Sequence, residues 1–164
     1  SKHLINEEEM SKVKIGKKIP GFTSTLDDGS EIKSTDLIGK NIVIYFYPKD
    51  STPGCTKEGE DFRDLYKKFT QCNAVIFGVS RDSVASHEKF KTKYNFPFHL
   101  ISDENESLCK LFDVIKEKNM YGRKYMGIER STFLINDEGI LVEEWRKVKV
   151  KGHAQAVLDT IDKN

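Results

Sequence analysis

Residues 48–55, which read PKDSTPGC, form the segment of this sequence with the clearest potential for chemistry. Their proline, glycine and hydroxyl side chains are typical of a turn that leads into a helix. Cys55 then lies in the first helical turn, where unpaired backbone N–H groups and the helix macrodipole favour an anion. Such surroundings lower a cysteine pKa from about 8.5 to about 3.5–7.5, and the thiolate is the reactive nucleophile. Cys55 is therefore the candidate nucleophile, and the alternative is a small side chain packed at a helix start.

Two elements must hold this turn in place, a strand before it and a helix after it. The run 41–47, NIVIYFY, is apolar throughout, which predicts a strand buried on both faces of a parallel sheet. The helix is expected to have Ser51 or Thr52 as its cap and Pro53 in its first turn. Its apolar residues follow at helical spacing: Phe62, Leu65, Tyr66 and Phe69.

The order of the other expected elements indicates the fold class. Turns at 28–29 and 137–139 each join two short strands. We expect strands at 21–26, 31–33, 74–80, 98–101, 131–136 and 140–145, and helices at 84–94, 108–112 and 152–162. This order predicts an α/β, thioredoxin-like fold: a mixed central β-sheet flanked by helices, with an N-terminal β-hairpin. Residues 1–14 are expected to be a loose leader, and residues 15–164 a single domain.

Composition narrows the classes of partner. Of the 164 residues, 27 are Lys or Arg and 26 are Asp or Glu, and this balance gives no reason to expect nucleic acid or a membrane surface. The longest apolar run is far too short to span a bilayer, and no targeting segment is apparent, so we expect a cytoplasmic protein. The three cysteines form no even disulfide framework, and the four histidines lack metal-ligand spacing. We therefore predict no metal and no cofactor.

Pro48, Thr52 and Cys55 match the Pro-x-x-x-Thr-x-x-Cys motif of the peroxiredoxins. The longer string YFYPKDSTPGCT resembles the PrxQ subfamily, also called bacterioferritin comigratory proteins. The similarity continues through FGVSRDS, HLISDEN, LFDV, RSTFLIND and VKGHAQAVL, and so covers nearly everything after the leader. The resemblance implies a thiol-dependent peroxidase that reduces hydrogen peroxide and alkyl hydroperoxides, serving antioxidant defence and redox homeostasis.

The same resemblance implies a role for each matching residue. Cys55 as thiolate attacks the hydroperoxide and becomes a sulfenic acid. Thr52 hydrogen-bonds the peroxide and the sulfur, and the backbone N–H groups of Gly54 and Cys55 donate to the peroxide oxygens. Pro48 shields the sulfur from water. Arg130 holds the thiolate and stabilises the transition state, although by itself it would be interpreted as a surface charge.

The sequence departs from the subfamily at the resolving cysteine. Many relatives carry it five residues after the first cysteine, where this chain has Glu60, or in the helix at 84–94, which contains none. Cys72 lies beyond the far end of the helix that Cys55 starts, roughly 20–25 Å away at about 1.5 Å per residue. Cys109 falls in an amphipathic stretch and is expected to pack in the core or face a partner. We therefore predict a one-cysteine mechanism with an external reductant such as thioredoxin, glutaredoxin or glutathione. We also expect a monomer or weak homodimer.

Two other interpretations remain open from the sequence. A glutathione-peroxidase-like enzyme on the same fold should have tryptophan and glutamine around its nucleophile, but the single tryptophan is Trp145, near the end of the chain. A redox-controlled binding or holdase module needs no combination of Pro48, Thr52, Cys55 and Arg130. Glu58 either holds the geometry of the site through hydrogen bonds or is a glutamate that the helix dipole favours near the N-terminus, and it stays outside the catalytic set.

Overall fold

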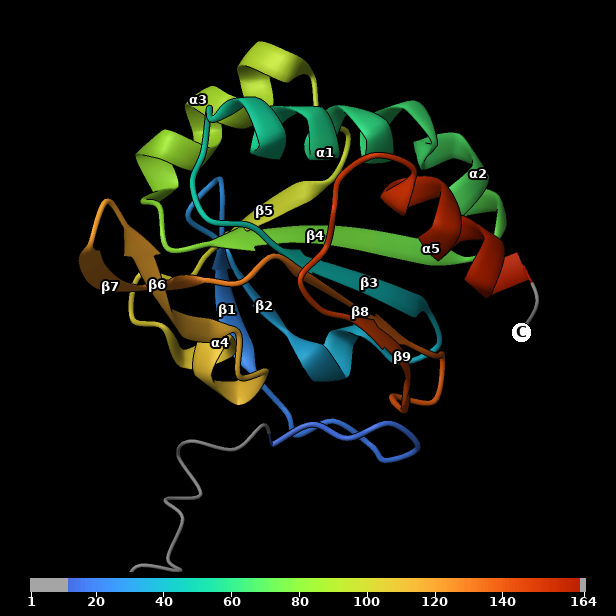
Figure 1. The fold of residues 1–164 in the computed structure, drawn as a ribbon. Coiled ribbons are helices and arrows are strands. Elements are labelled where there is room, and N and C mark those ends of the chain that lie inside the picture. The colour runs from blue at the N-terminus through green and yellow to red at the C-terminus, as the bar shows by residue number, and fades with distance from the viewer. Residues whose placement is uncertain (1–11, 163–164) are drawn as a thin grey trace, which may run out of the picture.

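A computed structural model describes residues 12–162, and a seven-stranded mixed sheet forms its centre (Figure 1). The strands follow one another across the sheet as β2 (Glu31–Lys33), β1 (Thr23–Leu26), β5 (His99–Ser102), β4 (Ala74–Ser80), β3 (Asn41–Phe46), β8 (Ser131–Ile135) and β9 (Leu141–Trp145). β3 pairs with β4, and β4 with β5, in parallel, whereas the other neighbours are antiparallel. The predicted mixed sheet and N-terminal hairpin are confirmed.

Four helices cover one face of the sheet, as Figure 1 shows. They are α1 (Pro53–Asp64), α2 (Tyr66–Gln71), α3 (Val84–Tyr94) and α5 (His153–Asp162). The other face carries the short helix α4 (Ser107–Leu111) and a 3-10 turn, η2 (Ser34–Leu37). The helix predicted to run on from Cys55 is two helices, because α1 ends at Asp64 and Leu65 separates it from α2.

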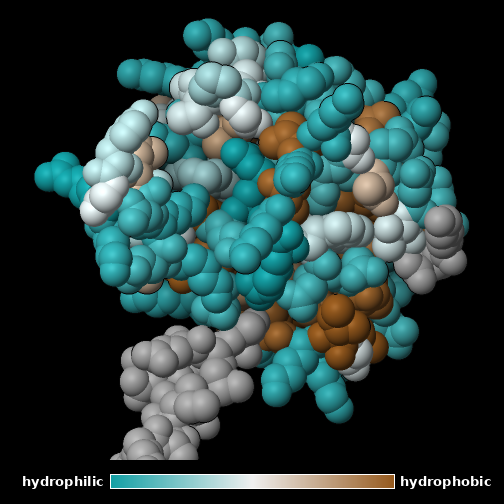
Figure 2. Space-filling model, viewed as in Figure 1, coloured by the Kyte–Doolittle hydropathy of each residue, from teal (hydrophilic) through white to brown (hydrophobic). Residues whose placement is uncertain are grey.

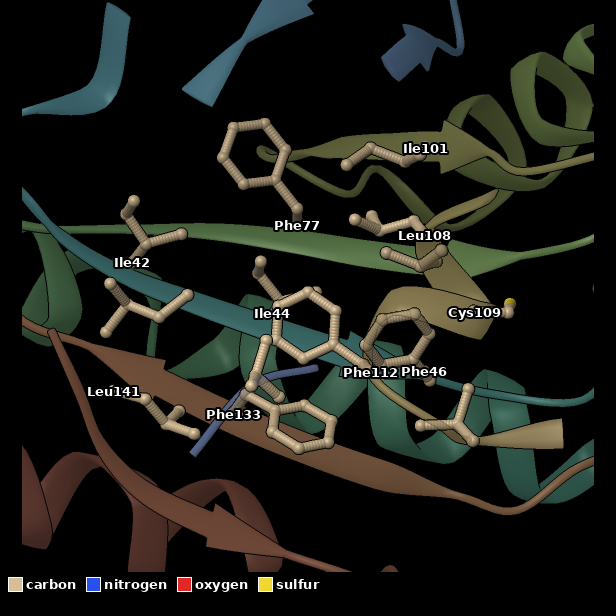
Figure 3. Close-up of a cluster of buried hydrophobic side chains, with 14 of the residues drawn as sticks. Ile42, Ile44, Phe46, Phe77, Ile101, Leu108, Cys109, Phe112, Phe133 and Leu141 are labelled. Atoms are coloured by element: carbon tan, nitrogen blue, oxygen red, sulfur yellow. The ribbon is translucent and has the colours of Figure 1, made fainter. Parts of the chain in front are cut away.

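The central strand β3 separates two apolar clusters, which explains its unbroken hydrophobic sequence. Ile42, Ile44 and Phe46 face a cluster that includes Phe133 and the buried Cys109 (Figure 3). Val43 and Tyr45, together with Tyr47 just after the strand, face the opposite cluster under the four helices. Successive side chains of a strand point to opposite faces, so a strand in the middle of a covered sheet must be apolar at every position.

A hairpin of β6 (Ile115–Met120) and β7 (Arg123–Ile128) was not predicted. It forms a separate two-stranded sheet, and most of its side chains are exposed or half-buried, so the sequence has neither an apolar run nor a clear alternation. Its turn places both Tyr121 and Gly122 at positive φ, a geometry usually marked by Asn-Gly or Asp-Gly. Because a tyrosine occupies the first of these positions, the sequence lacks the usual signal for this hairpin turn.

The predicted leader lies mostly outside the described residues, which begin at residue 12. Val13 is buried, and the backbone N–H of Lys12 donates to the carbonyl of Leu111 at 3.2 Å. The division at residue 15 stays a prediction. Between residues 12 and 162, no helix is long and apolar enough to cross a bilayer. Figure 2 shows a mostly hydrophilic face on which hydrophobic atoms form separate patches rather than one broad area.

Candidate active site

The start of α1 forms as the sequence predicts. Thr52 is the N-cap with an extended backbone, and Pro53 is the first helical residue. The Thr52 hydroxyl does not cap the helix; it donates instead to the carbonyl of Lys49 at 2.9 Å. The backbone N–H groups of Gly54 and Cys55 fall in the first turn, where a helix offers them no carbonyl. The turn therefore presents two backbone N–H donors beside the cysteine.

Arg130 supplies a cation to Cys55 from a distant part of the chain. It lies between β7 and β8, and its Nη2 atom is 3.4 Å from Cys55 Sγ. Cys55 is only 2% exposed, and the Arg130 side chain is 17% exposed. The guanidinium therefore places a fixed positive charge next to the sulfur, in a site largely closed to water.

Glu58 holds Arg130 from the other side. One turn after Cys55 in α1, it accepts a hydrogen bond from Arg130 Nη1 at 2.6 Å through Oε1. Burial raises the pKa of Glu58 to about 7, although the charge and hydrogen bond of Arg130 act in the opposite direction. Its second oxygen, Oε2, is buried and has no hydrogen-bond partner among residues 12–162. Glu58 thus belongs to the site, and its position one turn after Cys55 was the sequence signal for it.

Gly54 allows the guanidinium its close approach. A Cβ atom at this position would lie 3.3 Å from Arg130 Nη2, tighter than most real contacts of a Cβ atom. Any side chain here pushes against the cation that faces Cys55. The position of Arg130 therefore explains why residue 54 is a glycine.

The unpredicted β6–β7 hairpin contributes Lys118 to the surroundings of the site. Burial and the positive charge of Arg130 lower the pKa of Lys118, while the charge of the Cys55 sulfur opposes this. No pattern in the sequence pointed to Lys118, because the hairpin that carries it was not foreseen.

Pro48 is half-buried at the end of β3 and belongs to the same turn as Thr52. The three residues of the family motif and Arg130 therefore gather around the start of α1.

The structure also brings together Asp50, Asp82 and His87, although the histidines looked scattered in the sequence. One possible ligand atom from each lies within 4.8 Å of the others. These atoms are already engaged: Asp50 Oδ2 contacts His87 Nδ1 at 2.7 Å, and Asp82 Oδ2 accepts from the backbone N–H of Asp50 at 2.9 Å. Protein donors therefore satisfy the cluster, and it takes part in the support of the active-site turn.

The other two cysteines lie in different surroundings. Cys72 follows α2, and its thiol donates to Asp162 Oδ1 at 2.9 Å, which with burial raises its pKa. Cys109 is fully buried in α4, where burial and then the charge of Asp103 raise its pKa far above the usual range. Cys109 is thus a core residue, one of the two placements expected. Trp145 packs edge-on against His153.

Comparisons with known proteins identify the family of this chain. The profile of the AhpC/TSA family matches residues 15–144. Peroxiredoxin Bcp of Bacillus subtilis is 53% identical over 149 residues, which cover 91% of this chain and 95% of the relative. Peroxiredoxin Bcp of Xanthomonas campestris is 58% identical over 134 residues, covering 82% of this chain and 84% of the relative.

A solved structure points the same way. It is of the Xanthomonas campestris bacterioferritin comigratory protein, described in connection with alkyl peroxide reduction and a trapped intermediate and ligand complex. It superposes with a TM-score of 0.83 at 54% identity and covers 87% of this chain and 90% of its own. The chain therefore belongs to the AhpC/TSA family and is a thiol-dependent peroxidase of the peroxiredoxin Bcp and PrxQ type.

Proposed function

We propose that Cys55 is the residue that attacks the peroxide and that this chain works as a one-cysteine peroxidase. The observation that carries the assignment is the 3.4 Å contact between Cys55 Sγ and Arg130 Nη2 at the start of α1. A buried thiol beside a fixed cation and backbone N–H donors is the arrangement that a peroxide-attacking thiolate needs.

The reaction follows from these groups. The thiolate attacks one oxygen of the hydroperoxide; an S–O bond forms as the O–O bond breaks. The sulfur is oxidised to a sulfenic acid, and the leaving oxygen takes up a proton to give water or an alcohol. Arg130 and the N–H groups of Gly54 and Cys55 stabilise the negative charge that moves onto the oxygens. Thr52 aligns the peroxide with the sulfur, and Pro48 keeps bulk water away.

The substrates we propose are hydrogen peroxide and alkyl hydroperoxides. The Xanthomonas campestris protein is described by its alkyl peroxide reduction activity, and Cys55 occupies the corresponding family motif here. We also propose a monomer or weak homodimer. The face in Figure 2 shows separate hydrophobic patches rather than one broad area.

The sulfenic acid is resolved by a thiol from outside the chain. Both other cysteines have a raised pKa, so neither offers a ready thiolate: Cys109 is in the core and Cys72 is hydrogen-bonded to Asp162. One external thiol condenses with the sulfenic acid and releases water. A second thiol then attacks the mixed disulfide and restores Cys55. Thioredoxin, glutaredoxin or glutathione would supply these thiols in the reducing cytoplasm, the location we propose.

The test is peroxide consumption by the wild type and by Cys55→Ser, with thioredoxin and with glutathione in parallel. We expect Cys55→Ser to lose turnover while its circular dichroism is unchanged, because a serine hydroxyl is not appreciably ionised at neutral pH. Cys72→Ser and Cys109→Ser are the matched controls and should keep near-normal turnover. Retained turnover by Cys55→Ser would refute the assignment.

The one-cysteine mechanism has its own test. After one equivalent of peroxide, a dimedone-type probe should trap a sulfenic acid on Cys55, and non-reducing peptide mass spectrometry should find no dominant disulfide. A Cys55–Cys72 or Cys55–Cys109 cross-link within one chain would overturn this mechanism. Such a link would leave the role of Cys55 itself intact, so the two assignments fail separately.

A further inference from the structure

The turn that carries Pro48 and Thr52 is held in an unfavourable backbone conformation. We call residues 47–52 the Cys55 loop; it joins β3 to α1 and runs beside α3 in Figure 1. Ser51 in this loop has φ 65°, in the left-handed region that a residue with a Cβ atom seldom adopts. Such a conformation persists only where the surrounding contacts fix it. Neighbouring side chains must therefore supply the contacts that fix the Cys55 loop.

Asp50 is the residue through which the rest of the fold holds the loop. It is 6% exposed, and each of its carboxylate oxygens has a protein partner. Tyr47 donates its hydroxyl to Oδ1 at 2.7 Å, Ser86 donates to Oδ2 at 2.8 Å, and His87 Nδ1 lies 2.7 Å from Oδ2. The backbone N–H of Asp50 donates to Asp82 Oδ2. Strand end, loop and α3 thus meet at one buried carboxylate.

The hydrogen-bond pattern defines the charge of His87. Its Nε2 lies 2.8 Å from the carbonyl oxygen of Ile101, which can only accept, so Nε2 carries a proton. Its Nδ1 faces a carboxylate that already accepts from Tyr47 and Ser86, so Nδ1 carries a proton as well. Burial alone lowers the pKa of His87, but the hydrogen bond and negative charge of Asp50 outweigh it and raise the pKa overall. The geometry and the direction of the pKa shift both favour a buried imidazolium facing a buried carboxylate.

This pair is separate from the groups that contact the sulfur. Cys55 is contacted by Arg130, which in turn is held by Glu58, whereas Asp50 and His87 hydrogen-bond to the loop and to β5. An effect of the pair on the reaction must therefore pass through the residues of the loop. Thr52 is the loop residue that the proposed function assigns to alignment of the peroxide.

We infer that the buried Asp50–His87 ion pair is a positioning device that fixes the Cys55 loop, and thereby Thr52 and Pro48, in the geometry that peroxide attack requires. The inference rests on the proposed role of Cys55. A misplacement of about 1 Å in aligned reactants lowers a rate by about a hundredfold. Reaction of the same thiol with a simple alkylating reagent needs no such alignment. Comparison of the two reactions therefore separates positioning from the intrinsic reactivity of the sulfur.

Asp50→Asn is the direct test, because it removes the negative charge with almost no change in size. We expect its second-order rate constant with hydrogen peroxide to fall by about ten- to a hundredfold per folded molecule. Its rate of alkylation by iodoacetamide should stay within about twofold of the wild type, since Arg130 and the helix start are unchanged. Asp27→Asn is the matched control: Asp27 is also buried and bonded to a histidine, His99, but supports the N-terminal hairpin and β5. It should leave both rates unchanged.

Tyr47→Phe is the second variant and stays informative if Asp50→Asn folds poorly. It keeps the buried ring and removes one hydroxyl donor to Asp50, so we expect a smaller fall, about three- to tenfold, in the peroxide rate alone. A peroxide rate within twofold of wild type in both folded variants would overturn the inference. So would equal falls in the peroxide and iodoacetamide rates, because the pair would then act on the sulfur itself. Failure of the proposed function would appear elsewhere, as turnover retained by Cys55→Ser.

Discussion

Replacement of Glu58 by glutamine should change how the stability of this protein depends on pH. Burial raises the pKa of Glu58 from 4.5 to about 7 in the folded chain, so the folded state binds this proton more tightly than the unfolded state. The stability that comes from the protonated carboxyl is fully present below pH 4.5. This stability is lost as the pH rises through about 7, where the buried carboxyl group ionises to a carboxylate.

The size of the effect follows from the two pKa values. Each pKa unit corresponds to about 1.4 kcal/mol, so the wild type should lose about 3 kcal/mol of unfolding free energy from this group between pH 4 and pH 8. Because Glu58 is only 1% exposed, solvent screening removes little of this. Glu58→Gln cannot ionise and should lack the loss, so its stability relative to the wild type rises by about 3 kcal/mol over that range.

Urea unfolding of both proteins, followed by circular dichroism under reducing conditions at several pH values, measures the difference. The comparison cancels other titrating groups, such as His87, whose pKa is raised mainly by Asp50 against the effect of burial, and His153, whose pKa burial lowers to about 4. A difference between wild type and variant that stays constant within about 0.5 kcal/mol from pH 4 to 8 would refute the reasoning. The refuted step would be the protonation of Glu58 in the folded protein.

Three further outcomes follow from single contacts. Arg130→Lys should lower the rate with peroxide by about one to three powers of ten in stopped-flow measurements. An ammonium group cannot contact the sulfur and Glu58 together as the planar guanidinium does. A rate within twofold of wild type would contradict this. Gly54→Ala should lower the same rate by about three- to tenfold, since its Cβ atom would press on Arg130 Nη2 at 3.3 Å, and an unchanged rate would remove the steric argument. Gly59→Ala should destabilise the protein by about 1–3 kcal/mol in thermal or urea unfolding, because its Cβ atom would lie 2.4 Å from Phe96 Cζ. Helix propensity alone predicts a gain of about 1 kcal/mol, so the sign of the change decides between the two effects.

The start of α1 could be predicted from the sequence because short-range chemistry determines it. Thr52 and Pro53 have the residue types of a helix cap and first turn, and the apolar, β-branched run before them is typical of a strand buried on both faces. The position of Cys55, the proposed nucleophile, in the first turn of a helix could therefore be inferred from local reasoning. The same holds for β4 and α3, whose residues match the expected ranges 74–80 and 84–94.

Contacts between distant parts of the chain could not be predicted in this way. Arg130 has no local feature that distinguishes it from a surface arginine, and only the family motif selected it. The Asp50–His87 pair joins positions 37 residues apart and depends on how α3 packs beside the Cys55 loop. Periodicity gives the existence of α3 but not its position. The β6–β7 hairpin was not predicted because its strands bury few side chains and its turn begins with Tyr121.

The distance along the chain between Cys55 and Arg130 has a consequence for the order in which a newly made chain acquires its chemistry. The two residues are 75 positions apart, and Arg130 directly precedes β8, which pairs with β3 on its antiparallel side. A chain emerging from the ribosome exposes its earlier segments first. A nascent chain complete only to α3 therefore presents Cys55 without its guanidinium. The thiol acquires its cationic partner when β8 docks against β3, so assembly of the proposed active site depends on this late strand pairing during biosynthesis.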